Sequence, residues 1–364
     1  MKYVELTLLN FKELEGLYYV ALAIVTTSIA FACFLFDNYR AKILLIGVAA
    51  AVFSIGIANR SLGSDSVFYA SFYESLPSQI VGDLRLSFWQ QVTGAPEARI
   101  ADSGFIYLSS VLKTLGADVS IYFAVIAALI FGILIFQLRT MKVSLNYIAA
   151  ALGIFICTPI ALSVSANVLR QGLAAPLLML ALLYLYTNRT KEFCIAAFAS
   201  ISFHWSAVAF VLAAALWEIV KPVGNKIKFI MLLFCCFVLI ASLGSESIYS
   251  ATSIAGDRVS IVGRFFIFMF FVAACYRFGK SKSGIFQPLL SFRLPLLVVQ
   301  LALIAKPEMF IRLSVYMFVY DLTLLTLLLD SKLSRMQVAA LYFVCVLSAV
   351  VTYHIPMAAT ILGY

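Results

Sequence analysis

The sequence predicts an all-α, polytopic integral membrane protein that forms a single transmembrane domain over residues 1–364. Hydrophobic residues make up 63% of the chain and charged residues only 12%, and the mean hydropathy is +1.03. A soluble domain could not hide so much apolar surface from water. The chain also contains many apolar runs near the length that a helix needs to cross a bilayer, so we expect about 10 to 12 transmembrane helices.

The expected spans are separated mostly by short connections. They lie at residues 17–36, 43–58, 119–138, 145–162, 168–187, 229–243, 263–278, 294–305, 311–329 and 336–354. Two connections are long: residues 59–118, which are polar and rich in Asp, Ser, Gly and Arg, and residues 244–262. Inside the first, the run 104–116 carries Lys113 among apolar residues, which favours an interfacial or re-entrant helix over a span.

The distribution of basic residues orients these spans. Fifteen of the 26 Lys and Arg residues fall in the short loops at 37–42, 139–144, 188–191, 221–228, 277–293 and 330–335. Because short cytoplasmic loops carry an excess of Lys and Arg, these loops are expected in the cytoplasm. The N-terminus and the long loop 59–118 are then expected on the opposite, outer side of the membrane.

The segment 192–220 does not fit the pattern of full transmembrane spans. The basic loops on both sides of it belong on the same face, so the chain must enter the membrane and return. Its 29 residues are too few for two full crossings of about 20 residues each. We therefore expect a broken or re-entrant hairpin of two short helices, which carries His204 about 18 Å from the cytoplasmic edge and into the outer half of the membrane.

Arg170 and Gln171 lie at the start of the span 168–187. Polar side chains at such a position need a partner, a water-filled cavity or a function to offset their desolvation. Asn167 is the expected N-cap of this helix, and an arginine in the first turn of a helix favours binding of an anion. The alternative is an interfacial arginine that reaches the lipid headgroups.

Further arginines are expected on the outer side, where arginine outnumbers lysine. Arg264 and Arg312 lie near the starts of spans, and Arg60 directly follows one. Because arginine binds phosphate oxygens in a bidentate way, together with Arg170 they predict a cavity for a phosphorylated lipid. The alternative is scattered loop charge without a common site.

Three residues could act as acid, base or glycan ligand on that side: His204, Asp65 and Asp102. The alternatives are a satisfied core histidine and aspartates that serve in turns and helix caps. The sequence contains no Asp-x-Asp motif and only two histidines, His204 and His354. We therefore expect no metal site and no cofactor.

Several motifs in this order resemble the EpsG-like family of bacterial polysaccharide polymerases, which are of the Wzy or O-antigen polymerase kind. The motifs are Asn59-Arg60-x-x-Gly63-x-Asp65-x-x-x-Tyr69-x-x-x-Tyr73, Gly104-Phe105, Leu169-Arg170-Gln171, Phe203-His204-Trp205-Ser206 and Ile311-Arg312-x-x-x-Tyr316. They are spread over most of the chain, and the Arg-Gln and Phe-His-Trp-Ser motifs are the most specific.

The resemblance implies a metal-independent glycosyltransferase that works at the periplasmic face of a bacterial inner membrane, on lipopolysaccharide or related glycans. It would transfer a growing chain from one undecaprenyl pyrophosphate carrier to the sugar of another carrier-linked repeat unit. The expected partners are these carrier-linked glycans, the lipid bilayer, and a chain-length regulator and a flippase of the same pathway, with no nucleic acid.

The residues receive expected roles in this reaction. The pyrophosphate would be held by Arg170, Gln171, Arg312, Arg264 and Arg60, and Arg170 would also stabilise the developing charge. His204 or Asp65 would take the proton from the acceptor hydroxyl. The glycan would contact Asp102, Ser206 and Tyr69.

Two other functions remain open at this stage. An O-antigen ligase would use the same donor and similar arginines, but its large outer loop lies late in the chain, whereas here the longest loop follows the second span. A flippase or transporter would show internal repeats and several ionisable groups near the midplane. Here only Asp321 and His204 lie at that depth and no repeat is present.

Overall fold

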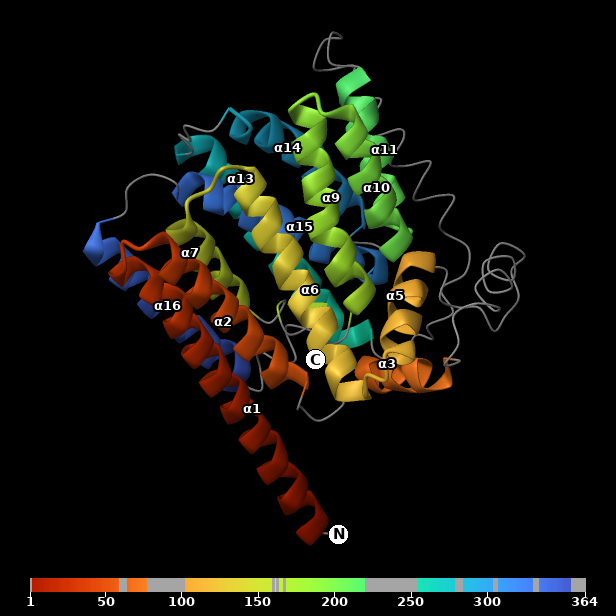
Figure 1. The fold of residues 1–364 in the computed structure, drawn as a ribbon, viewed down its shortest axis with the longest axis vertical. Helices are drawn as coiled ribbons and strands as arrows, with labels where there is room; N and C mark the ends of the chain where they lie inside the picture. The colour runs from red at the N-terminus through yellow and green to blue at the C-terminus, as the bar shows by residue number, and fades with distance from the viewer. Residues whose placement is uncertain are drawn as a thin grey trace.

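The computed structural model describes residues 2–58, 64–76, 102–158, 161, 164–165, 168–219, 254–278, 284–303, 307–329 and 334–354. Every regular element in these ranges is a helix (Figure 1). The first half of the chain contributes α1 (Lys2–Phe31), the short 3-10 helix η1 (Ala32–Leu35), α2 (Tyr39–Ala58), α3 (Ser64–Ser75), α5 (Ser103–Thr114), α6 (Val119–Thr140) and α7 (Leu145–Ile156). The second half contributes α9 (Leu169–Tyr186), α10 (Thr190–Phe203), α11 (Ala207–Ile219), α13 (Ile254–Phe278), α14 (Phe286–Leu303), α15 (Pro307–Leu329) and α16 (Arg335–His354).

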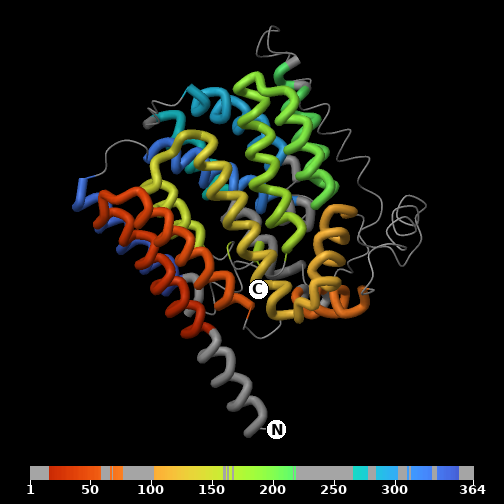
Figure 2. Tube along the Cα trace, in the orientation of Figure 1, coloured from red at the N-terminus to blue at the C-terminus, as the bar shows by residue number. Residues whose placement is uncertain are grey.

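The helices form a bundle in which the first and the last described helices pack together. α16 lies along α1, and α2 and α7 pack beside them on one side of the bundle (Figures 1 and 2). On the other side, α9 packs closely against α10, while α6 and α15 run between the two groups. The most buried of the long helices is α9, so it is the natural scaffold for a site inside the bundle.

The chain is a multi-pass membrane protein. Four helical segments in the described part are long and apolar enough to span a membrane: Gly16–Leu35, Tyr39–Ala58, Val119–Thr140 and Leu169–Tyr186. They agree with the predicted spans at 17–36, 43–58, 119–138 and 168–187. Shorter apolar helices follow at Leu145–Ile156, Phe265–Arg277, Phe286–Leu301, Leu313–Leu329 and Arg335–Val351. The predicted span 229–243 lies outside the described residues, and the total of about 10 to 12 spans stays a prediction.

Three predicted boundaries are wrong. α14 begins at Phe286, well before the expected start at 294, so Arg293 lies inside a helix and not in a cytoplasmic loop. A charged residue lowers the apparent hydropathy of its window, and the sequence could not show that Arg293 is neutralised by a partner on another helix. α13 begins at Ile254, so the end of the connection 244–262 is helical, and α7 ends at Ile156, short of 162.

The described parts of the long segment 59–118 are largely helical. They include α3 and α5, and the short helix predicted at 104–116 is confirmed by α5. Tyr73 of α3 stacks on Tyr122 of α6 with ring centroids 4.2 Å apart, and its hydroxyl donates to the carbonyl of Ala117 at 2.8 Å. These contacts fix α3 against the N-terminal end of α6, where Asp118 caps α6 by accepting from the Ile121 amide at 2.7 Å.

The predicted break within 192–220 is confirmed. α10 and α11 are two short helices that meet at His204 and return to the same end of α9 (Figure 1). Ser200 fixes α10 against α9 by donating to the carbonyl of Ala174 at 2.8 Å. The cytoplasmic location of both hairpin ends stays a prediction.

Candidate active site

The Asp102 carboxylate joins three segments that are distant in the sequence. Its Oδ2 atom accepts from Arg170 Nη1 at 2.7 Å and lies 3.3 Å from His204 Nδ1. Its Oδ1 atom accepts from the backbone amide of Trp205 at 2.9 Å. The carboxylate is 0% exposed, so these protein groups take the place of the water that would otherwise solvate its charge.

The hairpin break presents both the imidazole and the Trp205 amide to this carboxylate. His204 follows the last residue of α10 with an extended backbone, φ −157° and ψ 118°, which ends the helix there. The chain then turns, because the amides of Ala207 and Val208 donate to the carbonyls of His204 and Trp205. The Trp205 amide is therefore free of the helical ladder and can donate to Asp102.

Asp102 immediately precedes α5 and occupies its N-cap position. Its backbone carbonyl accepts from the amides of Phe105 and Ile106, while its side chain makes no cap hydrogen bond. The carboxylate is instead turned toward α9 and the hairpin break. A close contact between α5 and α10 makes this possible: a Cβ added at Gly104 would lie 2.5 Å from Ser202 Oγ and 3.1 Å from the backbone carbon of Ser202.

Arg170 lies in the first turn of α9 and contacts two neighbouring elements. Its Nη1 pairs with Asp102, and its Nε donates to the Tyr69 hydroxyl at 3.3 Å. Tyr69 itself packs edge-on against Phe105 of α5, with centroids 5.6 Å apart. The Arg170 side chain is 22% exposed, and its Nη2 atom makes no hydrogen bond to any residue that the structure describes. One edge of the guanidinium is thus available for an anion.

Ser206 links the hairpin break to α15. Its Oγ lies 3.0 Å from the Tyr316 hydroxyl, and the Tyr316 ring packs against Phe210 with centroids 4.8 Å apart. Tyr316 belongs to the motif Ile311-Arg312-x-x-x-Tyr316, but the sequence alone does not predict a function for it. Its spacing of one helical turn from Arg312 is the signal that could have assigned it to the same site.

Gln171 is buried beside Arg170 in the sequence, yet neither atom of its side-chain amide has a hydrogen-bond partner within the described part of the chain. Ser165 has the same property. The backbone before Ser165 passes close to α9, because a Cβ at Gly172 would meet the carbonyl oxygen of Val164 at 2.5 Å. Buried polar groups without partners are costly and rare, so this region has unused hydrogen-bonding capacity.

The structure therefore brings Arg170, His204, Asp102 and Tyr69 together, with Ser206 adjacent to His204. The side chains of Asp65, Arg264 and Arg312 lie outside the described part, although their helices α3, α13 and α15 are described. Arg60 and the expected N-cap Asn167 also lie outside it, and α9 begins after Val168 with no side-chain cap.

Among the described residues, no group of three or more His, Cys, Asp and Glu residues could hold a metal ion. The independence of the reaction from metal stays a prediction.

Comparison with known proteins gives one match. The sequence profile described as the EpsG family matches residues 42–364, which is most of the chain and includes every residue of the site above. The chain belongs to the EpsG family. Membership supports a function of the polysaccharide-polymerase type, consistent with a glycosyltransferase. Neither curated proteins nor solved structures give a match.

Proposed function

We propose that this EpsG-family protein is an O-antigen or capsular-type polysaccharide polymerase. It would act as a glycosyltransferase at the periplasmic face of the inner membrane and join repeat units carried on undecaprenyl pyrophosphate. Family membership supports the polymerase class. The observation that carries the catalytic part is the buried Asp102 carboxylate between Arg170 and His204, since it joins a potential base to a potential anion ligand.

In this proposal His204 is the general base. With a proton on Nδ1 facing Asp102, 3.3 Å away, the Nε2 atom carries the lone pair. Nε2 takes the proton of the acceptor hydroxyl, whose oxygen forms a bond to the anomeric carbon of the donor glycan. The bond between that carbon and the pyrophosphate oxygen breaks at the same centre, and the carrier pyrophosphate leaves. Asp65 is the alternative base.

Arg170 contacts the leaving pyrophosphate through Nη2, which makes no hydrogen bond to the residues that the structure describes. Asp102 balances the charge of Arg170, so attraction for the pyrophosphate also depends on the further arginines, Arg312, Arg264 and Arg60. Gln171 positions donor oxygens next to them.

Three residues around the base orient the glycan. Tyr69 and Ser206 offer hydroxyls, each already anchored to a neighbouring side chain. Asp102 has both oxygens occupied by protein groups, so its main effect is to orient His204 and Arg170. A direct contact between Asp102 and the glycan stays a prediction.

The test is polymerisation by purified protein. Carrier-linked repeat units in excess chelator should yield a ladder of longer glycans, and a protein with His204→Ala should yield at most a trace. A wild-type protein that needs magnesium or manganese would contradict the metal-independent reaction. In cells, a deletion strain with a single repeat unit on lipid A supports the polymerase, whereas a strain with none supports the O-antigen ligase or the flippase.

A further inference from the structure

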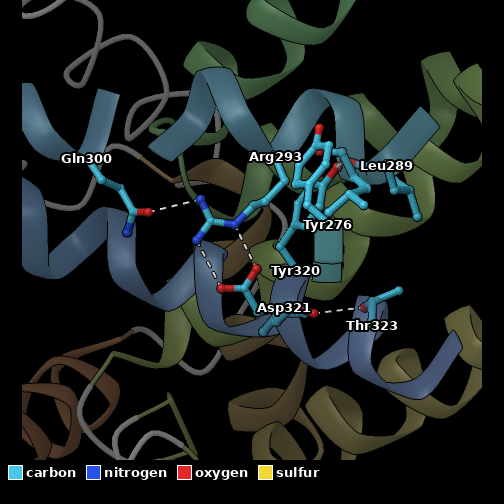
Figure 3. A network of polar contacts seen from close by, with 9 residues as sticks. Tyr276, Leu289, Arg293, Gln300, Tyr320, Asp321 and Thr323 are labelled. Carbon is cyan, nitrogen blue, oxygen red and sulfur yellow. Dashed lines mark hydrogen bonds and ion pairs between the residues drawn. The ribbon is translucent and has the colours of Figure 1, made fainter. Parts of the chain in front are cut away.

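A second buried charge cluster lies inside the bundle. Arg293 of α14 donates from Nε and Nη2 to the two carboxylate oxygens of Asp321 on α15, at 2.7 and 2.9 Å (Figure 3). Its Nη1 donates to Gln300 Oε1 at 3.0 Å, and its guanidinium lies 5.4 Å from the ring centroid of Phe268 on α13. The Arg293 side chain is 0% exposed. Every part of the guanidinium is therefore engaged by the protein.

The turn of α14 that carries Arg293 receives further polar contacts. Tyr320 of α15 donates to the carbonyl of Leu289 at 2.7 Å, and Tyr276 of α13 donates to the carbonyl of Leu290 at 3.2 Å (Figure 3). Pro295 lies inside this helix and removes one backbone donor from the same region. Pro295 leaves the carbonyl of Ser291 without its helical donor, and the two tyrosines tie the adjacent carbonyls of Leu289 and Leu290 to α15 and α13. We refer to Arg293, Asp321, Gln300, Tyr320 and Tyr276 as the Arg293 clamp.

Adhesion between the helices does not require such a clamp. The desolvation of a buried ion pair offsets much of its attraction, and well-packed apolar side chains of similar volume often hold elements together as well. A bidentate pair adds geometric specificity, because the planar fork meets the carboxylate in one orientation only. Its best-attested use is to fix the register of one helix against another.

The helix held in register is the one that also contacts the candidate site. Tyr316 and Tyr320 lie one turn apart on α15, so they face similar directions, and Asp321 follows directly. Asp321 lies about 7.5 Å along the helix axis from Tyr316, at 1.5 Å per residue. A rotation or slide of α15 that breaks the pair with Arg293 would therefore also move Tyr316 away from Ser206, next to His204.

We propose that the Arg293 clamp positions α15 for the reaction, so that Tyr316 stays against Ser206 and the hairpin break keeps His204 in place. This inference rests on the proposed function for its catalytic consequence. Arg293 and Asp321 are positioning residues in this scheme, because their hydrogen bonds join them to each other and to Gln300, and none of these bonds reaches the described residues around Asp102.

The test replaces the pair without leaving an unpaired charge. The double variant Arg293→Met, Asp321→Leu keeps similar volume and should insert and fold like the wild type. Its rate at saturating substrate should fall about tenfold or more, with little change in KM, since small displacements of reacting groups cost up to about 10²-fold. The exchanged pair, Arg293→Asp with Asp321→Arg, should recover most of that rate.

A matched control removes a contact between helices that carry no site residue. Ser28 and Tyr342 lie 2.7 Å apart between α1 and α16, so Ser28→Ala with Tyr342→Phe should leave the rate unchanged. A folded Arg293→Met, Asp321→Leu protein with the wild-type rate would overturn the inference. The ion pair would then only hold α14 and α15 together.

A second measurement does not depend on activity. In a background with the exposed Cys194→Ser, the variant Ser206→Cys reports how well Tyr316 covers position 206. Labelling by a water-soluble maleimide should become severalfold faster with the apolar pair and slow again with the exchanged pair. An unchanged labelling rate overturns the inference even if the wild-type protein proves not to polymerise glycans, so the two proposals fail separately.

Discussion

At the scale of single residues, Asp102 is the group on which the candidate site depends. It is one buried carboxylate with an arginine, a histidine and a backbone amide around it. Removing its charge leaves the Arg170 guanidinium without its anion and takes the negative charge away from the His204 imidazole, whose Nδ1 lies 3.3 Å from Oδ2. The role of Asp102 is therefore electrostatic and orienting, and a neutral residue of the same shape cannot replace it.

Asp102→Asn is the direct test of that role. An amide has one acceptor oxygen where the carboxylate offers two, so it cannot satisfy Arg170, His204 and the Trp205 amide together. We expect folded protein whose polymerisation rate falls by about tenfold or more, measured as glycan chain length and initial rate. The control is Asp118→Asn, because Asn also caps helices well and Asp118 only caps α6. Equal activity in both variants would contradict the role of Asp102.

Arg170→Lys separates an anion ligand from a residue that only anchors the helix. A lysine keeps the positive charge but loses the planar fork, which here contacts Asp102 and Tyr69 and leaves one edge for phosphate. We expect a loss of about 2 kcal/mol or more in transition-state stabilisation, as for removal of one donor to a developing anion. The surface pair of Arg189 with Glu192 offers the control, since Arg189→Lys should have no effect on polymer length. If the Arg170→Lys protein makes polymer of wild-type length, the function of Arg170 is structural only.

Gln171→Leu should raise the stability of the protein and weaken its use of the donor. The buried amide of Gln171 has no partner in the described part of the chain, so an apolar side chain of similar size removes a desolvation cost of about 1–3 kcal/mol. We expect a higher Tm and, because substrate can no longer use the amide, a higher KM for the carrier-linked donor. A variant that is more stable and fully active would show that the amide has no ligand.

At the scale of elements, the contact between α5 and α10 sets the distance from Asp102 to His204. The two helices approach so closely at Gly104 that no side chain fits there without a shift of Ser202. Because Asp102 is two residues before Gly104 and His204 two residues after Ser202, any separation of the helices acts directly on the pair. The site therefore depends on a glycine that makes no polar contact itself.

Gly104→Ala tests this dependence with a single methyl group. We expect an insertion-competent protein with a lower Tm and a polymerisation rate reduced by about tenfold, since overpacking of this kind costs about 1–3 kcal/mol and moves the backbone. Gly132→Ala on α6 is the matched control, because a Cβ there meets nothing within 4 Å. Ser202→Gly should partly restore the Gly104→Ala protein by removing the nearest atoms. An active, stable Gly104→Ala protein would contradict the argument.

At the scale of the whole molecule, the sequence predicts what is local and misses what depends on tertiary partners. The hairpin within 192–220 follows from length and charge, because 29 residues with basic loops on both sides cannot cross twice, whereas the position of its break at His204 comes from the structure. The pairing of Asp102 with Arg170 and His204 joins residues as far as 102 positions apart and leaves no periodic trace in the sequence. Arg293 was assigned to a loop for the same reason, since its neutralising partner Asp321 lies on another helix.

The orientation of the hairpin is the prediction on which the location of the site depends. α10 and α11 run back to the same end of α9, so labelling of Thr190→Cys and Gly224→Cys should occur from the same side of the membrane, the cytoplasmic one. The background needs Cys194→Ser, because Cys194 is exposed within the first turns of α10. Asp118→Cys, which precedes α6 beside the site, provides the control and should be labelled from the periplasm. Labelling of positions 190 and 224 from opposite sides would contradict the hairpin. Labelling of both positions from the periplasm would place the site on the cytoplasmic side, where the proposed carrier-linked donor would not reach it.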